Sequence, residues 1–139
     1  MLLGFQQRFE KKILAKQKRH TIRAKRKLPP RVGETCHCYV NPRRKTMRLL
    51  GRWPCVKVQD IHIKARKYAY LGHIVWIRID GVLLDADESQ ALALSDGFDS
   101  LVEMVNFWSG RLPFHGDMIH WDPDRPHPGP NKKKGRKRK

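Results

Sequence analysis

A hairpin signal between residues 74 and 84 is the strongest constraint on what this chain can fold into. Residues 74–79 and 82–84 are rich in branched apolar side chains, and Asp80-Gly81 separates the two runs. An Asp-Gly pair supplies the positive φ angles that a two-residue turn requires. The segment therefore predicts two antiparallel strands, which need further strands or helices beside them to be stable.

Hydrophobic spacing predicts the remaining elements. The extended stretch at 45–63 should contain a break near Gln59–Asp60, since Val56 and Val58 are even-numbered whereas Ile61 and Ile63 are odd-numbered. About five or six strands with helices between them favour an α+β fold, a small and mostly antiparallel β-barrel with flanking helices. The expected helices are 5–15, 88–94 and 100–108, and the expected further strands are 21–26, 35–40 and 118–121.

The charge of the chain limits its partners. Thirty Lys and Arg against thirteen Asp and Glu give a formal net charge of +17. So basic a chain repels itself unless it meets a polyanion, which makes nucleic acid the first candidate partner and an acidic membrane surface the second. Lys and Arg dominate residues 8–31 and 132–139, and none occurs between residues 79 and 110.

Composition also suggests the domain plan and the compartment. Four prolines between residues 122 and 131 precede the final basic run, so we expect one domain at 1–122 and a disordered basic tail at 123–139. No apolar stretch approaches the roughly 20 residues that span a bilayer, and the start of the chain does not resemble a signal peptide. We expect a cytoplasmic protein that is monomeric and binds no membrane.

The densest basic stretch joins the first helix to the first strand. A bend there would let Lys18 approach Thr21, and the cations Arg19, Arg23 and Lys25 would lower the pKa of Lys18, because like charges disfavour its protonated form. Such a lysine can act as a base toward a hydroxyl. The alternative interpretation, which composition alone favours, is a solvated strip of cations that faces phosphates.

Several short motifs in this order resemble the opening of the ASCH domain, a member of the PUA-like superfamily. They are Arg8-Phe9, Ile13-Leu14-Ala15, Lys18, Thr21-Ile22-Arg23 and Val32-Gly33-Glu34. Residues 93–98 are similar to a later helix-to-loop motif of that family, and residues 116–121 to the closing strand of its phage and prophage members. The resemblance covers about residues 5–122 and implies a β-barrel with a cleft for RNA or a nucleoside.

The same resemblance implies candidate catalytic residues. Some small bacterial members are amidohydrolases that remove the acetyl group of N4-acetylcytidine with a lysine base, a threonine nucleophile and a glutamate acid. The first two positions fall on Lys18 and Thr21, and the third falls on Asp96, whose side chain is one methylene shorter than glutamate. Asp96 precedes Gly97, so ordinary turn chemistry is the alternative interpretation of this residue.

The three cysteines are not expected to hold a metal. Cys36 and Cys38 would place both sulfurs on one side of a strand, and Cys55 and His37 could complete a zinc site. Structural zinc sites, however, usually have two to four residues between paired ligands, and cysteine is often a plain core residue. We therefore expect reduced core cysteines, no metal and no cofactor.

Aromatic residues are the last candidates for a binding surface. Most of the four tryptophans should belong to the core, with Trp53 the most exposed and able to stack on a base. Tyr68 and Tyr70 follow Lys64, Arg66 and Lys67, which is a mixture typical of single-stranded nucleic-acid sites but also of a charged loop.

The function expected from these features is binding of RNA, or of a nucleotide within it, by a basic cleft that includes Lys18, Thr21, Arg23 and Asp96. The alternatives are hydrolysis of an N4-acylated cytidine-type nucleoside and binding of DNA or an anionic protein, for example as a phage accessory protein. The expected nucleic-acid contacts are Arg19, Arg23, Lys25, Arg43, Arg44, Lys45, Lys132, Lys133 and Lys134.

Overall fold

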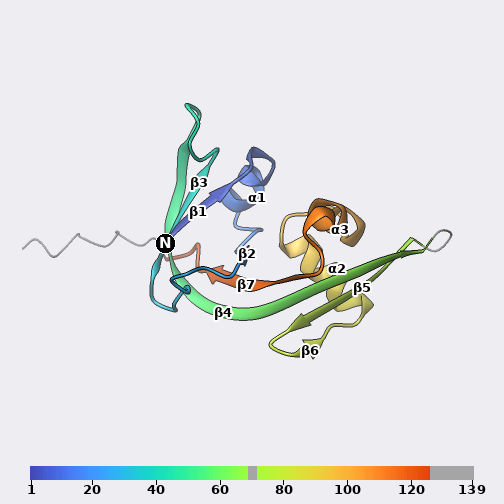
Figure 1. Cartoon of the computed structure of the whole chain (residues 1–139). Helices are drawn as coiled ribbons and strands as arrows, with labels where there is room; N and C mark the ends of the chain where they lie inside the picture. The colour runs from blue at the N-terminus through green and yellow to red at the C-terminus, as the bar shows by residue number, and fades with distance from the viewer. Residues whose placement is uncertain (69–71, 126–139) are drawn as a thin grey trace, which may run out of the picture. The chain divides into compact units, whose positions relative to one another are not determined.

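A computed structural model describes residues 1–68 and 72–125 of the chain (Figure 1). Its elements include two short 3-10 helices, labelled η1 and η2. In chain order the elements are β1 (Leu2–Phe5), η1 (Gln7–Phe9), α1 (Glu10–Leu14), β2 (His20–Ala24), β3 (Thr35–Val40), β4 (Arg48–Tyr68), β5 (Gly72–Ile79), β6 (Val82–Leu83), α2 (Ala86–Ser95), α3 (Leu101–Trp108), η2 (Ser109–Arg111) and β7 (Phe114–Trp121).

The strands form one mixed sheet, so the α+β class is confirmed but the predicted barrel is wrong. Hydrogen bonds connect β1, β3, β4, β5 and β6 in that order, and β7 pairs with both β2 and β4. β1 and β3 are parallel, whereas the pairs β3–β4, β4–β5 and β5–β6 are antiparallel. Within the described residues, β1 and β6 are the two ends of this path and do not pair with each other. The path therefore keeps two edges, which a closed barrel does not have.

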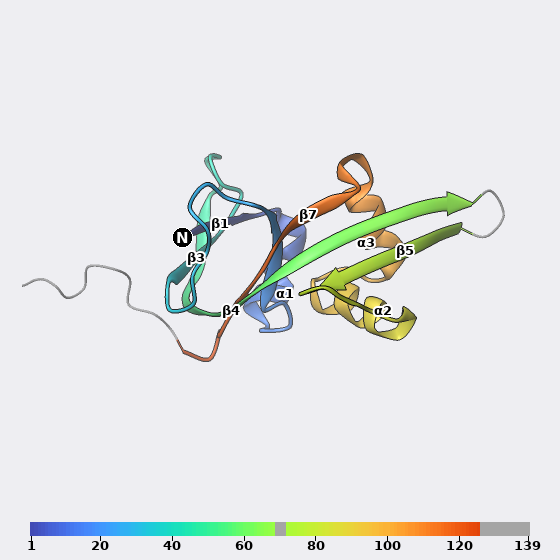
Figure 2. The same cartoon turned by 60° about the horizontal axis from the view of Figure 1, so that its bottom comes forward.

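The chain divides into two compact units. Unit 1 comprises Met1–Arg19, Pro30–Lys57 and the residues from His120 onward, and unit 2 comprises His20–Pro29 and Val58–Ile119. β4 and β7 each contribute residues to both units, and Figure 2 shows β4 as the longest strand of the chain. No helix in the described ranges is long and apolar enough to cross a membrane.

Unit 1 begins with a strand where the sequence predicts a helix. Phe5 belongs to β1 and lies opposite Val40 of β3, so the helix predicted from residue 5 begins only at Glu10, after a single 3-10 turn. The helical spacing of Phe9 and Ile13 is real, because both side chains are buried. Phe5 is buried as a residue of the strand β1. Its spacing from Phe9 and Ile13 therefore fits a helical pattern although Phe5 does not belong to the helix.

β4 runs without the break predicted near Gln59–Asp60. That prediction assumed that Val56 and Val58 face the core, but Val56 is 40% exposed and Val58 is half-buried. Cys55 is buried before this point and Ile61 and Ile63 are buried after it, although Pro54 is also buried and Lys57 is exposed. The strand is continuous across residues 59 and 60, and a register shift lies between Cys38 and Tyr39 of β3 instead.

The predicted hairpin is confirmed in unit 2. Asp80 and Gly81 have φ angles of 51° and 83°, and they join β5 to β6 with Ile79 opposite Val82. Both positive angles are those of the turn that Asp-Gly favours.

Side-chain caps begin both longer helices of this unit. The carboxylate of Asp85 accepts a hydrogen bond from the Glu88 amide at the start of α2. Ser100, the first residue of the helix predicted at 100–108, accepts one from the Glu103 amide at the start of α3. The Glu103 carboxylate, however, accepts from the Asp99 amide. These caps satisfy amide groups that have no partner within the helix.

One face of the β4–β5 pair belongs to the core of unit 2, and the other face does not. Ile61 and Ile63 of β4 and Ile77 of β5 are at most 2% exposed. α2 and α3 contribute buried side chains to the same unit, including Leu92, Met104 and Trp108. The even-numbered residues of β4 and β5 project to the opposite face of the pair.

The beginning of the predicted tail is tied to unit 1. The amide of Asp122 donates to the carbonyl of Pro54, and Pro123 is buried. The remaining predicted tail, residues 126–139, lies outside the described residues, as do its candidate contacts Lys132, Lys133 and Lys134.

Candidate functional site

The face of the β4–β5 pair away from the buried isoleucines is basic. His62, Lys64 and Arg66 are exposed at alternate positions of β4, between the buried residues Ile61 and Ile63 and the half-buried residue Ala65. Alternation along a strand sends all three exposed side chains to the same side. We call this side of the pair the open face. It comprises His62, Lys64 and Arg66 of β4 and the residues opposite them in β5, which are Arg78, Trp76 and Ile74.

β5 adds an aromatic ring and another cation to the open face. Trp76 lies directly opposite Lys64 in the register, and Arg78 lies opposite His62. Directly opposite residues of an antiparallel pair project to the same side. The Nζ atom of Lys64 lies 5.7 Å from the centre of the Trp76 ring, within the range of a cation–π contact.

A hollow lies beside Trp76 on this unit. Its volume is about 440 Å³, which falls in the range of small-ligand sites. Trp76, Lys64 and Arg66 line it from the strands, and Leu112 and Pro113 line it from the segment before β7. An aromatic ring and two cations beside a hollow can hold a flat base and its phosphates.

The charges of unit 2 are unevenly distributed. Arg66 and Arg78 form no ion pair with the described residues, so both guanidinium groups are available to an anion. Three exposed acidic residues, Asp85, Asp87 and Glu88, lie at the start of α2, and no Lys or Arg occurs between residues 79 and 110. A polyanion is therefore attracted to the strands of this unit and repelled by the start of α2.

Unit 1 carries the predicted basic loop between β3 and β4. Arg43, Arg44 and Lys45 are all exposed there, and Arg43 has a φ angle of 65°. Arg44 and Arg8 line a hollow of about 560 Å³ beside this loop. The loop presents cations as the sequence predicts, but no tryptophan lines this hollow.

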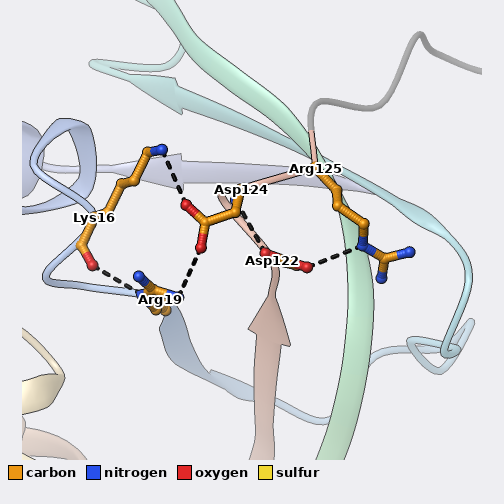
Figure 3. Close-up of polar contacts among 5 residues, drawn as sticks. All are labelled: Lys16, Arg19, Asp122, Asp124 and Arg125. Atoms are coloured by element: carbon orange, nitrogen blue, oxygen red, sulfur yellow. Dashed lines mark hydrogen bonds and ion pairs between the residues drawn. The ribbon is translucent and has the colours of Figure 1, made fainter.

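Arg19 has an acidic partner within unit 1 (Figure 3). Its Nη1 atom lies 3.4 Å from Oδ2 of Asp124, and the Nζ atom of Lys16 lies 3.0 Å from the other carboxylate oxygen. The hydrogen bond from Lys16 holds the pKa of Asp124 below its usual value. Asp122 pairs in turn with Arg125 at 2.9 Å. These carboxylates partly neutralise the cations around Arg19.

Arg23 and Lys25 are engaged within unit 2. Arg23 donates to the hydroxyl of Thr21 at 3.0 Å. Lys25 donates to Asp117 at 2.7 Å and to Asp60 at 2.8 Å. The hydrogen bonds to Asp117 and Asp60 raise the pKa of Lys25 above its ordinary value. Both cations are less available to phosphates than Arg66 and Arg78.

The three residues proposed for catalysis are all buried polar side chains. Lys18 is 2% exposed, Thr21 is 5% exposed and Asp96 is 4% exposed. Lys18 belongs to unit 1, whereas Thr21 and Asp96 belong to unit 2. The Nζ atom of Lys18 lies 5.0 Å from the centre of the Phe9 ring and 5.8 Å from that of Phe5. That Lys18, Thr21 and Asp96 act together in one site stays a prediction from the sequence.

His20 and Ser95 are neighbours of Asp96 that the sequence argument missed. The Nδ1 atom of His20 lies 3.1 Å from Oδ1 of Asp96, and its Nε2 atom lies 3.0 Å from Oγ of Ser95. Asp96 follows α2 as its C-cap, in a helical conformation, before Gly97 with a φ angle of 103°. Asp96 is thus both a residue of the helix-to-turn junction and the partner of a buried histidine.

The cysteines are core residues, as predicted. Cys36, Cys38 and Cys55 are at most 1% exposed. The contact with the Cys55 thiol and burial both raise the pKa of Cys36. The same contact lowers the pKa of the Cys55 thiol.

The tryptophan prediction needs a correction. Trp53 is 9% exposed and stacks on Trp121 with ring centres 6.2 Å apart. Trp76 is only half-buried and belongs to the open face. Trp53 is buried on β4, and its sequence neighbours Arg52 and Pro54 gave no sign of this burial. The side chain of Tyr68 and the whole of Tyr70 lie outside the described residues.

The resemblance to the ASCH domain rests on the sequence motifs alone. The chain matches no protein-family model, no curated protein and no solved structure.

Proposed function

We propose that this protein binds single-stranded nucleic acid through the open face of β4 and β5. The observation that supports this most is the position of Trp76, beside Lys64 and between the cations of two strands. Bases of a single strand stack on aromatic rings, and flanking cations neutralise the phosphates. The net charge of +17 adds long-range attraction to any such polymer.

RNA is the polymer that we expect, because the resemblance to the ASCH domain implies it. A duplex hides its bases in the stack, so a half-buried tryptophan on a strand surface suits unpaired bases better. The exposed loop at 41–47 would then add phosphate contacts that do not depend on sequence. A preference for duplex DNA would favour the alternative of a DNA-binding accessory protein.

Replacing Trp76 by alanine should weaken binding of a short single-stranded RNA by on the order of 10–100-fold, the usual cost of removing one base-stacking ring. Fluorescence anisotropy with a labelled oligouridine measures this effect. Trp76→Phe keeps a stacking surface and should recover most of the affinity. Ile74→Ala is a control on the same face, since Ile74 is 40% exposed but carries no ring. Equal affinities of wild type and Trp76→Ala would contradict the proposal.

Hydrolysis of an N4-acylated cytidine-type nucleoside is the second candidate function. The burial of Lys18, Thr21 and Asp96 favours it, because polar side chains are mostly exposed in proteins and buried ones call for an explanation. Incubation of the protein with N4-acetylcytidine, followed by mass spectrometry, tests this candidate directly. Release of acetate with formation of cytidine would support it, and an unchanged substrate would count against it.

A further inference from the structure

A cluster of one carboxylate and two imidazoles lies in unit 2, apart from the residues discussed for catalysis. Asp60 and His62 are alternate residues of β4, and His115 belongs to β7. The Nε2 atom of His115 lies 2.7 Å from Oδ1 of Asp60, and the Nε2 atom of His62 lies 3.2 Å from Oδ2. One ligand atom from each residue can be chosen so that all three lie within 4.8 Å of one another.

This arrangement is close to that of a metal site. Zinc lies about 2.0–2.2 Å from nitrogen and oxygen ligands in tetrahedral sites, which places neighbouring ligand atoms roughly 3.3 Å apart. The distance of 3.2 Å from Oδ2 of Asp60 to the His62 nitrogen already matches this value, and the 2.7 Å contact of His115 with Oδ1 is a hydrogen bond that metal binding would replace. We propose that Asp60, His62 and His115 bind a divalent transition-metal ion, with Zn²⁺ as the reference ion.

The orientation of Asp60 is fixed by groups around it. Lys25 donates to Oδ1 of Asp60 and is itself held by Asp117, whose side chain is 10% exposed. The backbone amide of Asp60 donates to the Asp80 carboxylate at 2.9 Å, and the Asp80 amide donates to the Asp60 carbonyl. The hydrogen bond from Lys25 to the carboxylate is of a kind that metal sites regularly contain, and the two bonds with Asp80 hold the Asp60 backbone. Oδ2, on the side of His62, is the oxygen that Lys25 leaves to the ion.

The rings of His62 and His115 stack on each other beside Asp60. Their ring centres lie 3.9 Å apart with the planes inclined by 29°, and both Nε2 atoms point to the same carboxylate. Neutral imidazoles in this arrangement can both donate a lone pair to one ion.

The donor set indicates which ions fit. Imidazole nitrogens suit zinc, copper, nickel and iron, and two histidines with one carboxylate leave positions open for water or another ligand. The side chains of His62 and His115 are about half exposed, so an ion would be accessible from solvent. Asp60 and Asp117 together outweigh the charge of Lys25, although Arg78 opposite His62 adds a second cation nearby.

Titration of the full chain, first freed of metal with a chelator, tests the site. Isothermal titration with ZnCl₂ should show one ion per chain. Loss of a ligand costs more than the 10–100-fold that a supporting residue costs, so His62→Ala, His115→Ala and Asp60→Asn should each weaken binding by more than about 100-fold. His37→Ala, which removes a histidine of unit 1 that accepts from Arg52, should change the affinity by less than about twofold.

Two readouts decide the outcome. Long-range ¹H–¹⁵N spectra of the imidazoles should show Zn²⁺ displacing the Nε2 resonances of His62 and His115 while that of His37 stays in place. Co²⁺ in place of Zn²⁺ should give no thiolate charge-transfer band, since the cysteines are not ligands. Absence of binding, equal affinity in all the variants, or a thiolate band would each overturn the proposal. Circular dichroism of each variant checks that it is folded.

Discussion

Raising the salt concentration from 50 to 200 mM should weaken the binding of single-stranded RNA by about a thousandfold. Each phosphate contact releases condensed counterions, and the logarithm of the affinity falls with the logarithm of the salt concentration by about 0.7 per contact on a single strand. A thousandfold loss over this range corresponds to a slope near −5 and therefore to about seven contacts. The thirty Lys and Arg residues of the chain provide more cations than this number needs.

The slope also distinguishes cations that contact phosphate from those that do not. Replacing Lys64 and Arg66 together by alanine should flatten it by about 1.4, the value of two contacts. Replacing Lys16 and Arg19 together removes the same charge, but both already pair with Asp124 and should affect the slope less. Anisotropy titrations at four salt concentrations measure this slope for the wild type and for both double variants. An affinity that is insensitive to salt, or equal slopes for the two double variants, would contradict the assignment of the open face.

Local patterns predicted the local elements of this fold. The Asp80-Gly81 turn and the cap at Ser100 depend on neighbouring residues, so both could be recognised from the sequence. The strand β3 matches its predicted range of 35–40 for the same reason. The parallel pairing of Phe5 with Val40 joins segments far apart in the chain, and the helical spacing of Phe5 concealed it.

The sequence alone indicates only part of the open face. Lys64 and Arg66 stand at alternate positions of one strand, so the sequence shows that they share a side. Trp76 joins them through the β4–β5 register, which depends on the pairing of two strands and not on local spacing. The sequence therefore gave no reason to place Trp76 rather than Trp53 on the surface. The cluster of Asp60, His62 and His115 was hidden in the same way, because it depends on β7 lying beside β4.

Lys18→Met should abolish turnover of N4-acetylcytidine, if wild-type protein shows that activity, while the protein stays folded. A lysine that serves as the base toward Thr21 cannot be replaced by a side chain without a titratable group. Methionine is close to lysine in length and suits a site between the rings of Phe5 and Phe9, so packing is maintained. Mass spectrometry of the nucleoside measures turnover, and thermal unfolding checks the fold.

Two matched results would complete this test. Asp96→Glu should raise the rate, since it restores the reach of the acid that the ASCH resemblance implies. RNA affinity of Lys18→Met should stay within about twofold of wild type, because one buried cation of many is removed. Undiminished turnover in Lys18→Met would exclude Lys18 as the base. Loss of RNA binding together with turnover would show that Lys18 belongs to the RNA site instead.

Mapping of a bound single strand by NMR tests the nucleic-acid interface most directly. With ¹⁵N-labelled protein and a short oligouridine, the account predicts the largest shift changes at the Trp76 indole N–H and at the amides of residues 62–66 and 74–78. The amides of α2 should stay unchanged, because the exposed acids at its start repel the polymer. Shift changes centred on α2, or on residues 18–21 and 96 with Trp76 unaffected, would contradict binding by the open face.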